Sequence, residues 1–271
     1  MPIPPETPPN AKPRILAIAN QKGGVGKTTT SINLAAALAL AGERVLIIDL
    51  DPQGNASTGL GIARTDRATG TYRLLTDAPN AADTIRPTLI PNLAIIPAEP
   101  DLAGAEIELV AFERREYRLR DALAGPLPYG FILIDCPPSL GLLTLNALVA
   151  ADSVLVPLQT EFFALEGISQ LIRTIDMVGR RLNPALVLQG IVLTMFDRRN
   201  NLSDLVASDA RGFFGQRVYT TVIPRNIRVS EAPSHGKPVL LYDPRSPGAQ
   251  AYIALAQEFL SRERSPKAPL A

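Results

Sequence analysis

The chain has 271 residues, 46% of them hydrophobic, and a formal net charge of +1. This composition can bury a sizeable core, and its near-neutral balance excludes a polycation, so any nucleic-acid binding must use a local basic patch. The one cysteine, Cys136, excludes a disulfide or a multi-cysteine metal site within one chain, and no apolar run is long enough to span a bilayer.

The first 13 residues contain six prolines and no apolar core, which distinguishes them from a secretory signal. We therefore predict a disordered, proline-rich tail over residues 1–13 and a single domain over residues 14–271. The same features predict a cytoplasmic protein.

Short apolar runs alternate with longer helical patterns along the rest of the chain. The predicted strands are Ile15–Asn20, Val45–Asp49, Leu93–Pro97, Phe131–Asp135, Ser153–Leu158, Leu186–Leu193 and Val218–Ile223. The predicted helices are Thr28–Ala41, Leu102–Ala124, Leu140–Ala150, Ala164–Arg181, Ser203–Phe214 and Gly248–Arg262. This alternation predicts an α/β fold with a mostly parallel, twisted sheet and helices on both faces. Ligands of such sheets bind at the carboxyl ends of the strands.

A turn rich in glycine and lysine separates the first predicted strand from the first helix. Its backbone N–H groups can point into one concavity, and the helix N-terminus adds partial positive charge there. This arrangement predicts a phosphate-binding loop, in which Lys27 reaches the outer phosphates and the Thr28 hydroxyl holds Mg²⁺. The predicted nucleotide-binding residues of the loop are Lys22, Gly23, Gly24, Val25, Gly26, Lys27, Thr28 and Thr29.

The loop departs from the usual P-loop pattern, because Gln21 stands where that pattern has glycine and a second lysine, Lys22, precedes the glycines. This KGGxGKT variant resembles the deviant Walker A box of the family that contains the ParA/Soj chromosome-partitioning ATPases, MinD and the iron protein of nitrogenase. The resemblance implies a P-loop NTPase-like fold, ATP and Mg²⁺ as cofactors, and a homodimer in which Lys22 crosses to the partner's nucleotide. The alternative is a surface turn, which the flanking strand and helix disfavour.

Two carboxylates, Asp49 and Asp51, lie one residue apart at the end of the second predicted strand, so extended backbone points them the same way. A lone aspartate here could be a turn former or helix cap, but the pair follows a phosphate-binding loop. The stretch DxDPQGN resembles the partitioning ATPases, which implies that Asp51 positions the attacking water and that Asp49 supports the Mg²⁺ shell through water. Phosphoryl transfer needs such an in-line water and neutralised phosphate oxygens.

Four apolar residues precede Asp135, which is a Walker B pattern when it accompanies a P-loop. We expect Asp135 to hold Mg²⁺ through a water or the Thr28 hydroxyl. The prolines after it would stiffen a loop that senses the γ-phosphate. Cys136 is interpreted as a small buried neighbour rather than a nucleophile.

Two later stretches, residues 194–202 and 223–238, also resemble the partitioning ATPases. The resemblance implies that they line the adenine pocket, with Met195 and Pro224 flanking the base and Arg225 and Asn226 completing the turn. His235, the single histidine, lies in a predicted loop, where we expect neither a metal nor a catalytic role.

Basic residues are concentrated in the C-terminal portion, because residues 198–245 contain eight Lys or Arg against four Asp or Glu, a net of +4. Such side chains can contact DNA phosphates without reading bases, although an ordinary solvated face has the same composition. The resemblance assigns the DNA contacts to Arg199 and Arg228. Weaker candidates from composition are Arg211, Arg217, Lys237 and Arg245.

The resemblance extends over residues 14–262 and is closest to chromosomal ParA proteins of the Caulobacter kind. It implies a DNA-segregation ATPase with Lys22, Lys27 and Asp51 as catalytic residues. Its Mg-ATP sandwich dimer would bind double-stranded DNA non-specifically at the nucleoid, and hydrolysis stimulated by a ParB-type partner would release it.

Three rival interpretations share the loop. A MinD-like membrane-associated ATPase would use a basic amphipathic C-terminal helix, but residues 247–260 contain no Lys or Arg, so we expect no membrane partner. An iron–sulfur reductase would need two cysteines per subunit. An ATP-dependent ligase or synthetase would need a substrate pocket, which residues 230–238 do not suggest.

Overall fold

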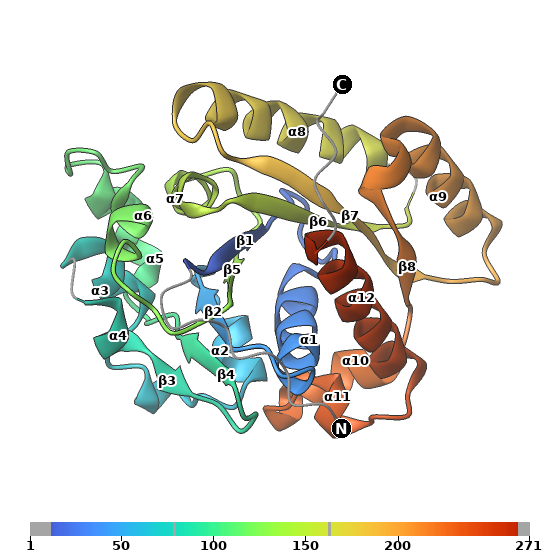
Figure 1. Cartoon of the computed structure of the whole chain (residues 1–271), viewed down its shortest axis with the longest axis horizontal. Coiled ribbons are helices and arrows are strands. Elements are labelled where there is room, and N and C mark those ends of the chain that lie inside the picture. Colours follow the sequence, from blue (N-terminus) through green and yellow to red (C-terminus); the bar gives the residue numbers. More distant parts are fainter. Residues whose placement is uncertain (1–11, 78–79, 162–163, 265–271) are drawn as a thin grey trace.

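The computed structural model describes residues 12–77, 80–161 and 164–264, so the predicted tail lies outside the described part except for Lys12 and Pro13. An eight-stranded sheet passes between layers of helices (Figure 1), in the order β3-β4-β2-β5-β1-β6-β7-β8. The strands are β1 (Arg14–Ile18), β2 (Val45–Asp49), β3 (Arg86–Pro87), β4 (Leu93–Ile96), β5 (Phe131–Asp135), β6 (Ser153–Gln159), β7 (Val187–Phe196) and β8 (Val218–Pro224).

The sheet is parallel from β4 to β8, and only the edge strand β3 runs antiparallel to its neighbour. This confirms the predicted α/β fold and all seven predicted strands. Strand β3, which was not predicted, has two residues, and one of them is proline, a residue that edge strands tolerate. It contains no apolar run from which the sequence could have predicted it. Because β2 and β5 pair with Asp49 opposite Asp135, the carboxyl ends of these strands bring the two carboxylates side by side.

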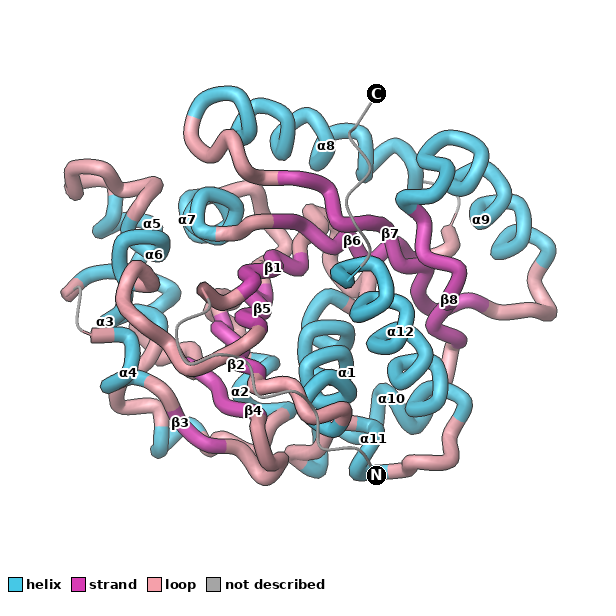
Figure 2. The backbone as a smooth tube through the Cα atoms, in the orientation of Figure 1, coloured by secondary structure: helices cyan, strands magenta, loops and turns pink. Residues whose placement is uncertain are grey.

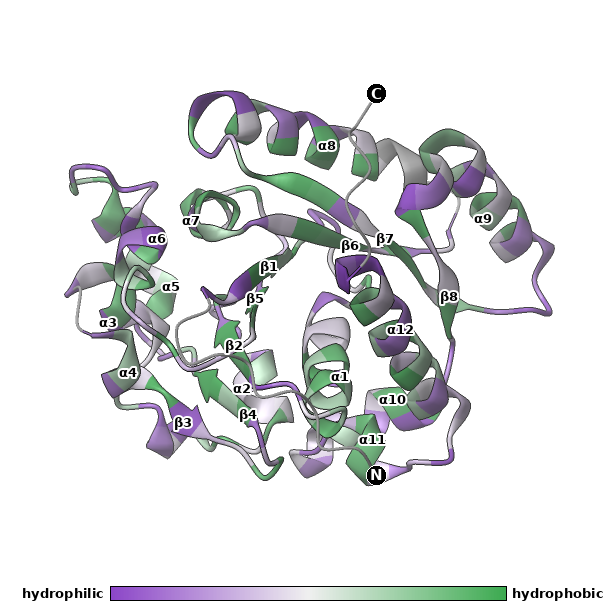
Figure 3. Ribbon diagram, in the orientation of Figure 1, coloured by the Kyte–Doolittle hydropathy of each residue, from purple (hydrophilic) through white to green (hydrophobic). Residues whose placement is uncertain are grey.

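Alternate side chains of each strand enter two separate cores, one on each face of the sheet. Ile15 and Ala17 enter the first core, whereas Leu16 and Ile18 enter the second. The tube view shows strands enclosed by helices on both sides (Figure 2), and β6 and β7 are mostly hydrophobic while α8 alternates between the two colours (Figure 3). This arrangement is what continuous apolar strands require.

Each face has its own set of helices. The first core is covered by α3 (Thr71–Thr76), α4 (Ala81–Thr84), α5 (Leu102–Leu109), α6 (Arg118–Ala122), α7 (Leu142–Ala150), α8 (Ala164–Arg181) and α9 (Asn201–Phe214). The second core is covered by α1 (Lys27–Leu40), α2 (Asn55–Gly59), α10 (Ile227–Glu231), α11 (Val239–Tyr242) and α12 (Pro247–Arg264).

The last helix, α12, packs against α1 and β8. Its apolar face is buried, because Tyr252, Leu255, Ala256 and Phe259 all lie in the second core. No helix in the described ranges combines the length and the apolar character needed to cross a membrane.

The predicted single helix Leu102–Ala124 is wrong, because the structure divides it into α5 and α6. The backbone turns at Arg114, whose φ of 54° is left-handed. Asn146 of α7 stabilises the break: its amide donates to the carbonyl oxygen of Arg115 at 2.8 Å and accepts from the backbone N–H of Leu119 at 3.1 Å. A contact from a distant helix therefore overrides the local helical pattern.

Replacing Asn146 tests this interpretation. Asn146→Ala should lower the free energy of unfolding by about 2–3 kcal/mol, because it leaves buried backbone groups without partners. Denaturation with urea measures the loss. The matched control is Asn80→Ala, since Asn80 caps α4 through an exposed hydrogen bond from the N–H of Ala82 and its loss should cost about 1 kcal/mol. Equal losses in both variants would show that Asn146 does not hold the break.

Candidate functional site

The predicted phosphate-binding loop lies between β1 and α1 and has the required backbone. Gly24 and Gly26 have φ values of 74° and 85°, in the left-handed region that favours glycine. Helix α1 begins at Lys27 with Gly26 as its N-cap and no side-chain cap, and the N–H of Thr30 makes its first internal bond to Gly26. The preceding N–H groups therefore have no acceptor within the helix and can bind phosphate oxygens.

Lys27 lies buried over this loop, with 6% of its surface exposed. Its Nζ atom donates to the carbonyl oxygen of Lys22 at 3.0 Å. Burial lowers the pKa of Lys27, and the carboxylate of Asp135 is the largest opposing influence. The ammonium is thus held beside the loop by a backbone carbonyl and by neighbouring negative charge.

Asp135 ends β5 and is fully buried. Its Oδ1 atom accepts a hydrogen bond from the Ser31 hydroxyl at 2.8 Å, and the nearby Thr28 hydroxyl favours its charged form. Burial, followed by the carboxylate of Asp49, raises the pKa of Asp135. Its buried Oδ2 atom has no hydrogen-bond partner among the described residues.

This donor set fits Mg²⁺ that arrives with a nucleotide. An unpartnered buried carboxylate oxygen beside a hydroxyl can bind a metal-bound water, and Mg²⁺ usually keeps several waters and takes further oxygens from phosphate. The described part of the chain contains no group of three His, Cys, Asp or Glu side chains that could hold a metal alone. The residues that would hold the ion are therefore Thr28 and Asp135 together with phosphate.

Asp49 is bound on both carboxylate oxygens by protein groups. Oδ2 accepts from the backbone N–H and hydroxyl of Ser57 at 2.8 and 2.6 Å, and Oδ1 accepts from the N–H of Asp51 at 3.3 Å. Burial raises the pKa of Asp49 to about 6. The structure thus shows Asp49 anchoring the start of α2, and any support of the Mg²⁺ shell would have to share these oxygens.

Asp51 lies in a tight turn after β2 and is 6% exposed. Its Oδ1 atom accepts from the N–H of Gln53 at 2.9 Å, and its carbonyl oxygen accepts from the N–H of Gly54 at 2.8 Å. Its negative charge opposes the lowering of the Lys27 pKa, so the two side chains share one site. The structure therefore brings Lys27, Asp51 and Asp135 together, as the sequence predicts.

Lys22 points to a different element. Its Nζ atom forms an ion pair with Glu161 at 2.8 Å, and both side chains are about half exposed. Gln159 also donates to Glu161, and Gln21 donates to the carbonyl oxygen of Gly167 in α8 at 2.8 Å. The lysine is thus held within its own chain by the segment between β6 and α8.

A cleft of about 630 Å³ opens at the carboxyl ends of β7 and β8. Its described lining residues are Phe196, Asp197, Arg198, Arg199, Val222, Pro224, Arg225, Asn226, Pro247 and Ala251. Pro224, Arg225 and Asn226 therefore line the cleft as the predicted base pocket requires. Met195 immediately precedes Phe196 and is half-buried, with a left-handed φ of 52°.

A hydrogen bond links the phosphate-binding loop to the strand that leads to the cleft. The Thr194 hydroxyl at the end of β7 donates to the carbonyl oxygen of Val25 at 2.8 Å. Phosphates bound at the loop and a base bound in the cleft could therefore belong to one nucleotide. Part of the turn also has a structural role, because the Asn226 side chain caps α10 by accepting from the N–H of Arg228 at 3.0 Å.

The predicted DNA-binding arginines are paired with carboxylates of their own chain. Arg199 contacts Asp197 through Nε at 3.1 Å and Nη2 at 3.0 Å, and this bond lowers the pKa of Asp197 to about 2. Arg228 contacts Glu231 at 2.9 Å and Asp243 at 3.5 Å. Both arginines follow the carboxyl ends of their strands, and the exposed Lys237 and Arg245 lie near α11.

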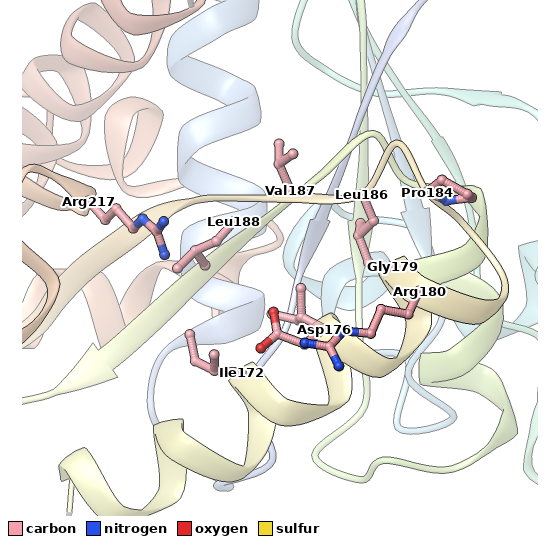
Figure 4. A pocket seen from close by; sticks show the side chains of 10 residues that line it. Ile172, Asp176, Gly179, Arg180, Pro184, Leu186, Val187, Leu188 and Arg217 are labelled. Carbon is pink, nitrogen blue, oxygen red and sulfur yellow. The ribbon is translucent and has the colours of Figure 1, made fainter. Parts of the chain in front are cut away.

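Arg211 and Arg217 lie towards the amino end of β8, at the opposite end of the strands. They belong to the end of α9 and the turn before β8, whereas Arg199 and Arg228 follow the far ends of β7 and β8. Arg217 reaches a cavity of about 360 Å³ that Asp176 and Arg180 of α8 also line (Figure 4). The six basic residues predicted from sequence therefore do not form one patch.

Two residues have the surroundings expected for bystanders. Cys136 is buried, and burial raises the pKa of its thiol, which does not suit a nucleophile. His235 is exposed and stacks on the ring of Tyr242, with centroids 4.8 Å apart.

Sequence reasoning missed several residues that hold the site. Ser31, which binds Asp135, stands one helical turn after Lys27, and this spacing could have identified it. Glu161 lies 139 positions from its partner Lys22, and Ser57 lies eight positions from Asp49. No local pattern connects these pairs, so only the structure reveals them.

A family model described as an AAA domain matches residues 13–188. The chromosome partitioning protein ParA of Caulobacter vibrioides is 62% identical over 261 residues, which cover 95% of this chain and 98% of that protein. The sporulation initiation inhibitor protein Soj of Bacillus subtilis is 56% identical over 246 residues, covering 90% and 97% of the two chains.

Solved structures show the same fold. Cobyrinic acid a,c-diamide synthase from Mycobacterium smegmatis, with bound ADP and magnesium, has a TM-score of 0.82 at 38% identity and covers 93% of this chain and 96% of that one. The cell division ATPase MinD of Pyrococcus furiosus has a TM-score of 0.77 at 28% identity, covering 92% and 98%. These neighbours confirm the predicted P-loop NTPase-like fold.

Lys27 gives the most direct test of the site. Lys27→Ala should weaken Mg-ADP binding about tenfold to a hundredfold, because it removes the buried cation nearest the phosphates. Calorimetry with ADP measures this without interference from turnover. Lys22→Ala is the matched control, since that lysine is half exposed and paired with Glu161. Equal ADP affinity in the parent and Lys27→Ala would show that Lys27 does not bind the phosphates.

Proposed function

The chain belongs to the ParA/Soj family of chromosome-partitioning ATPases, and on that basis we propose that it moves a DNA locus by an ATP-driven cycle of dimerisation, DNA binding and release. It is an ATPase that uses ATP and Mg²⁺. The observation that carries the proposal is the joint position of Lys27 at the start of α1, Asp51 after β2 and Asp135 at the end of β5. The carbonyl oxygen of Lys22 accepts from Lys27 beside them.

The chain's own groups have distinct tasks in hydrolysis. The N–H groups at the start of α1 and the ammonium of Lys27 bind and orient the phosphates, and Asp51 positions the attacking water. Asp135 and Thr28 orient the metal shell, and bound Mg²⁺ neutralises charge on the phosphate oxygens. Pro224, Arg225 and Asn226 hold the base, with Met195 beside them, and residues 14–271 act as one domain.

Dimerisation would exchange an ion pair within the chain for a contact between chains. Lys22 must leave Glu161 before it can reach the nucleotide of a second copy. The pair is about half exposed on both sides, and exposed ion pairs contribute only about 0–1 kcal/mol. The free energy lost when this ion pair breaks is therefore small, and the γ-phosphate can shift the population towards the dimer.

Two matched variants test the exchange. Lys22→Ala should bind ATP as a monomer but lose ATP-dependent dimerisation and hydrolysis. Glu161→Gln removes the competing carboxylate and should dimerise at equal or lower ATP concentration than the parent. Light scattering with a slowly hydrolysed ATP analogue measures both. If Lys22→Ala dimerises and turns over ATP like the parent, Lys22 does not act across the interface.

DNA binding is proposed for the surface around Arg199 and Arg228. Each arginine is paired with a carboxylate of its own chain, so a single subunit offers DNA little unpaired charge there. A dimer would present two such surfaces together, which raises the effective affinity for phosphates without reading sequence. Lys237 and Arg245 would extend this surface, and non-specific binding of this kind would place the protein at the nucleoid.

Charge reversal tests whether DNA binds this surface or the basic residues towards the amino end of β8. Arg199→Glu and Arg228→Glu should weaken DNA binding but leave ATP-dependent dimerisation intact, and the salt slope should fall by about one for each phosphate that the variant no longer binds. Asp197→Asn frees Arg199 and should strengthen binding. Arg211→Glu and Arg217→Glu are the controls, because both residues lie towards the amino end of β8. Filter retention at two salt concentrations measures binding, and unchanged affinity in the Arg199/Arg228 double variant would contradict the assignment.

A ParB-type centromere-binding partner is proposed as the trigger of hydrolysis, on the strength of the family. Two rival functions are less favoured. A synthase-like role rests on a neighbour at 38% identity, compared with 62% for the Caulobacter ParA. A MinD-like membrane role would need an apolar helix face, but that of α12 is buried against the sheet side of the molecule.

A further inference from the structure

Arg67 is a buried arginine without a carboxylate acceptor among the described residues. Only 4% of its surface is exposed, although arginine is seldom buried unless it is paired. Its guanidinium donates to the carbonyl oxygen of Ile62 through Nε at 3.2 Å and Nη2 at 2.7 Å. Nη2 also donates to the Thr58 hydroxyl at 2.8 Å, and Nη1 donates to the carbonyl oxygen of Gly54 at 3.2 Å.

The Gly54 carbonyl ends the turn that begins at Asp51. Gly54 closes this turn by donating its N–H to the carbonyl oxygen of Asp51 at 2.8 Å. Its φ of 63° is left-handed, and a Cβ atom there would collide with Nη1 of Arg67. The guanidinium therefore packs directly on the turn, in space that only glycine leaves open.

The turn is fixed at both ends. At its start, the N–H of Asp51 donates to Asp49, which is itself held by Ser57. At its end, the Gly54 carbonyl accepts from the N–H and the hydroxyl of Thr58, both at 3.0 Å, and from Arg67 at 3.2 Å. Arg67 also donates to the Thr58 hydroxyl. The bonds from Arg67 therefore add a side-chain anchor to the backbone anchor that the start of α2 provides.

We propose that Arg67 is a positioning residue for ATP hydrolysis. It holds the Asp51–Gly54 turn so that the carboxylate of Asp51 stays within hydrogen-bonding reach of the attacking water. The proposal rests on the role proposed above for Asp51. Positioning errors of about 1 Å can cost about a hundredfold in rate, so a rigid turn matters more for turnover than for binding. The planar guanidinium suits this task because it bonds three acceptors at once, which the single ammonium of lysine does less well.

Steady-state hydrolysis by the full chain tests the proposal. Arg67→Met should lower kcat about tenfold to a hundredfold, with KM for Mg-ATP changed by less than about twofold. Arg67→Lys should retain the charge but recover only part of the rate. The matched control is Arg118→Met: Arg118 likewise bonds helix-end carbonyls, those of Leu75 and Thr76 at 2.7 and 2.9 Å, but lies on the other face of the sheet. That control should keep the parent kcat.

A second variant decides the matter if Arg67→Met fails to fold. Thr58→Val preserves shape at an exposed position and removes the hydroxyl that joins Arg67 to Gly54. A fall in kcat at unchanged KM supports the proposal. A parent-like kcat in folded Arg67→Met, or in Thr58→Val where Arg67→Met does not fold, overturns it, as does an equal fall in Arg118→Met.

Asp51→Ala distinguishes a failure of the Arg67 proposal from a failure of the role proposed for Asp51. If Asp51→Ala hydrolyses ATP at the parent rate, the role of Asp51 is wrong, and the positioning role of Arg67 falls with it. If Asp51→Ala is inactive while the Arg67 and Thr58 variants turn over normally, only the Arg67 proposal is wrong. Adding Arg67→Met to Asp51→Ala should cause no further loss, because two residues that act as one unit are not additive.

Discussion

Burial of carboxylates at the carboxyl ends of neighbouring parallel strands is the constraint on which the site depends. Asp49 and Asp135 face each other in the register of β2 and β5, and neither is exposed. Buried charge is costly unless hydrogen bonds or opposite charge compensate it. Ser57 compensates Asp49 and so fixes α2, while Ser31 compensates Asp135 and so fixes α1. Helix α2 and helix α1, which carries Lys27 and Thr28, are thus positioned by the carboxylates themselves.

The same constraint explains the buried lysine. Lys27 loses hydration on burial, which lowers its pKa, but Asp135 and Asp51 oppose that effect. An ammonium and a helix N-terminus can bind an anion, and the neighbouring carboxylates can bind a metal ion that accompanies it. Phosphate with Mg²⁺ meets both needs, which agrees with the nucleotide and magnesium found in the solved neighbour.

At the surface, the groups proposed to act between molecules are engaged within the chain. Lys22 pairs with Glu161, Arg199 with Asp197 and Arg228 with Glu231. These pairs are exposed enough to be weak, so a nucleotide or DNA can replace their carboxylates at little cost. A cycle that depends on repeated assembly and release benefits from such partners, because each state differs from the next by small energies.

The sequence by itself determined the elements whose signals are local. The glycines between an apolar strand and a helix, the aspartates that end β2 and β5, and the alternation of strand and helix sufficed to predict the fold and the position of Lys27, Asp51 and Asp135. Only the tertiary structure decided that Asn146 divides the helix predicted over residues 102–124 and that Glu161 holds Lys22. It also decided that Arg67 packs on the Asp51 turn. Each of these depends on side chains that meet across the fold, and hydrophobic periodicity carries no information about such contacts.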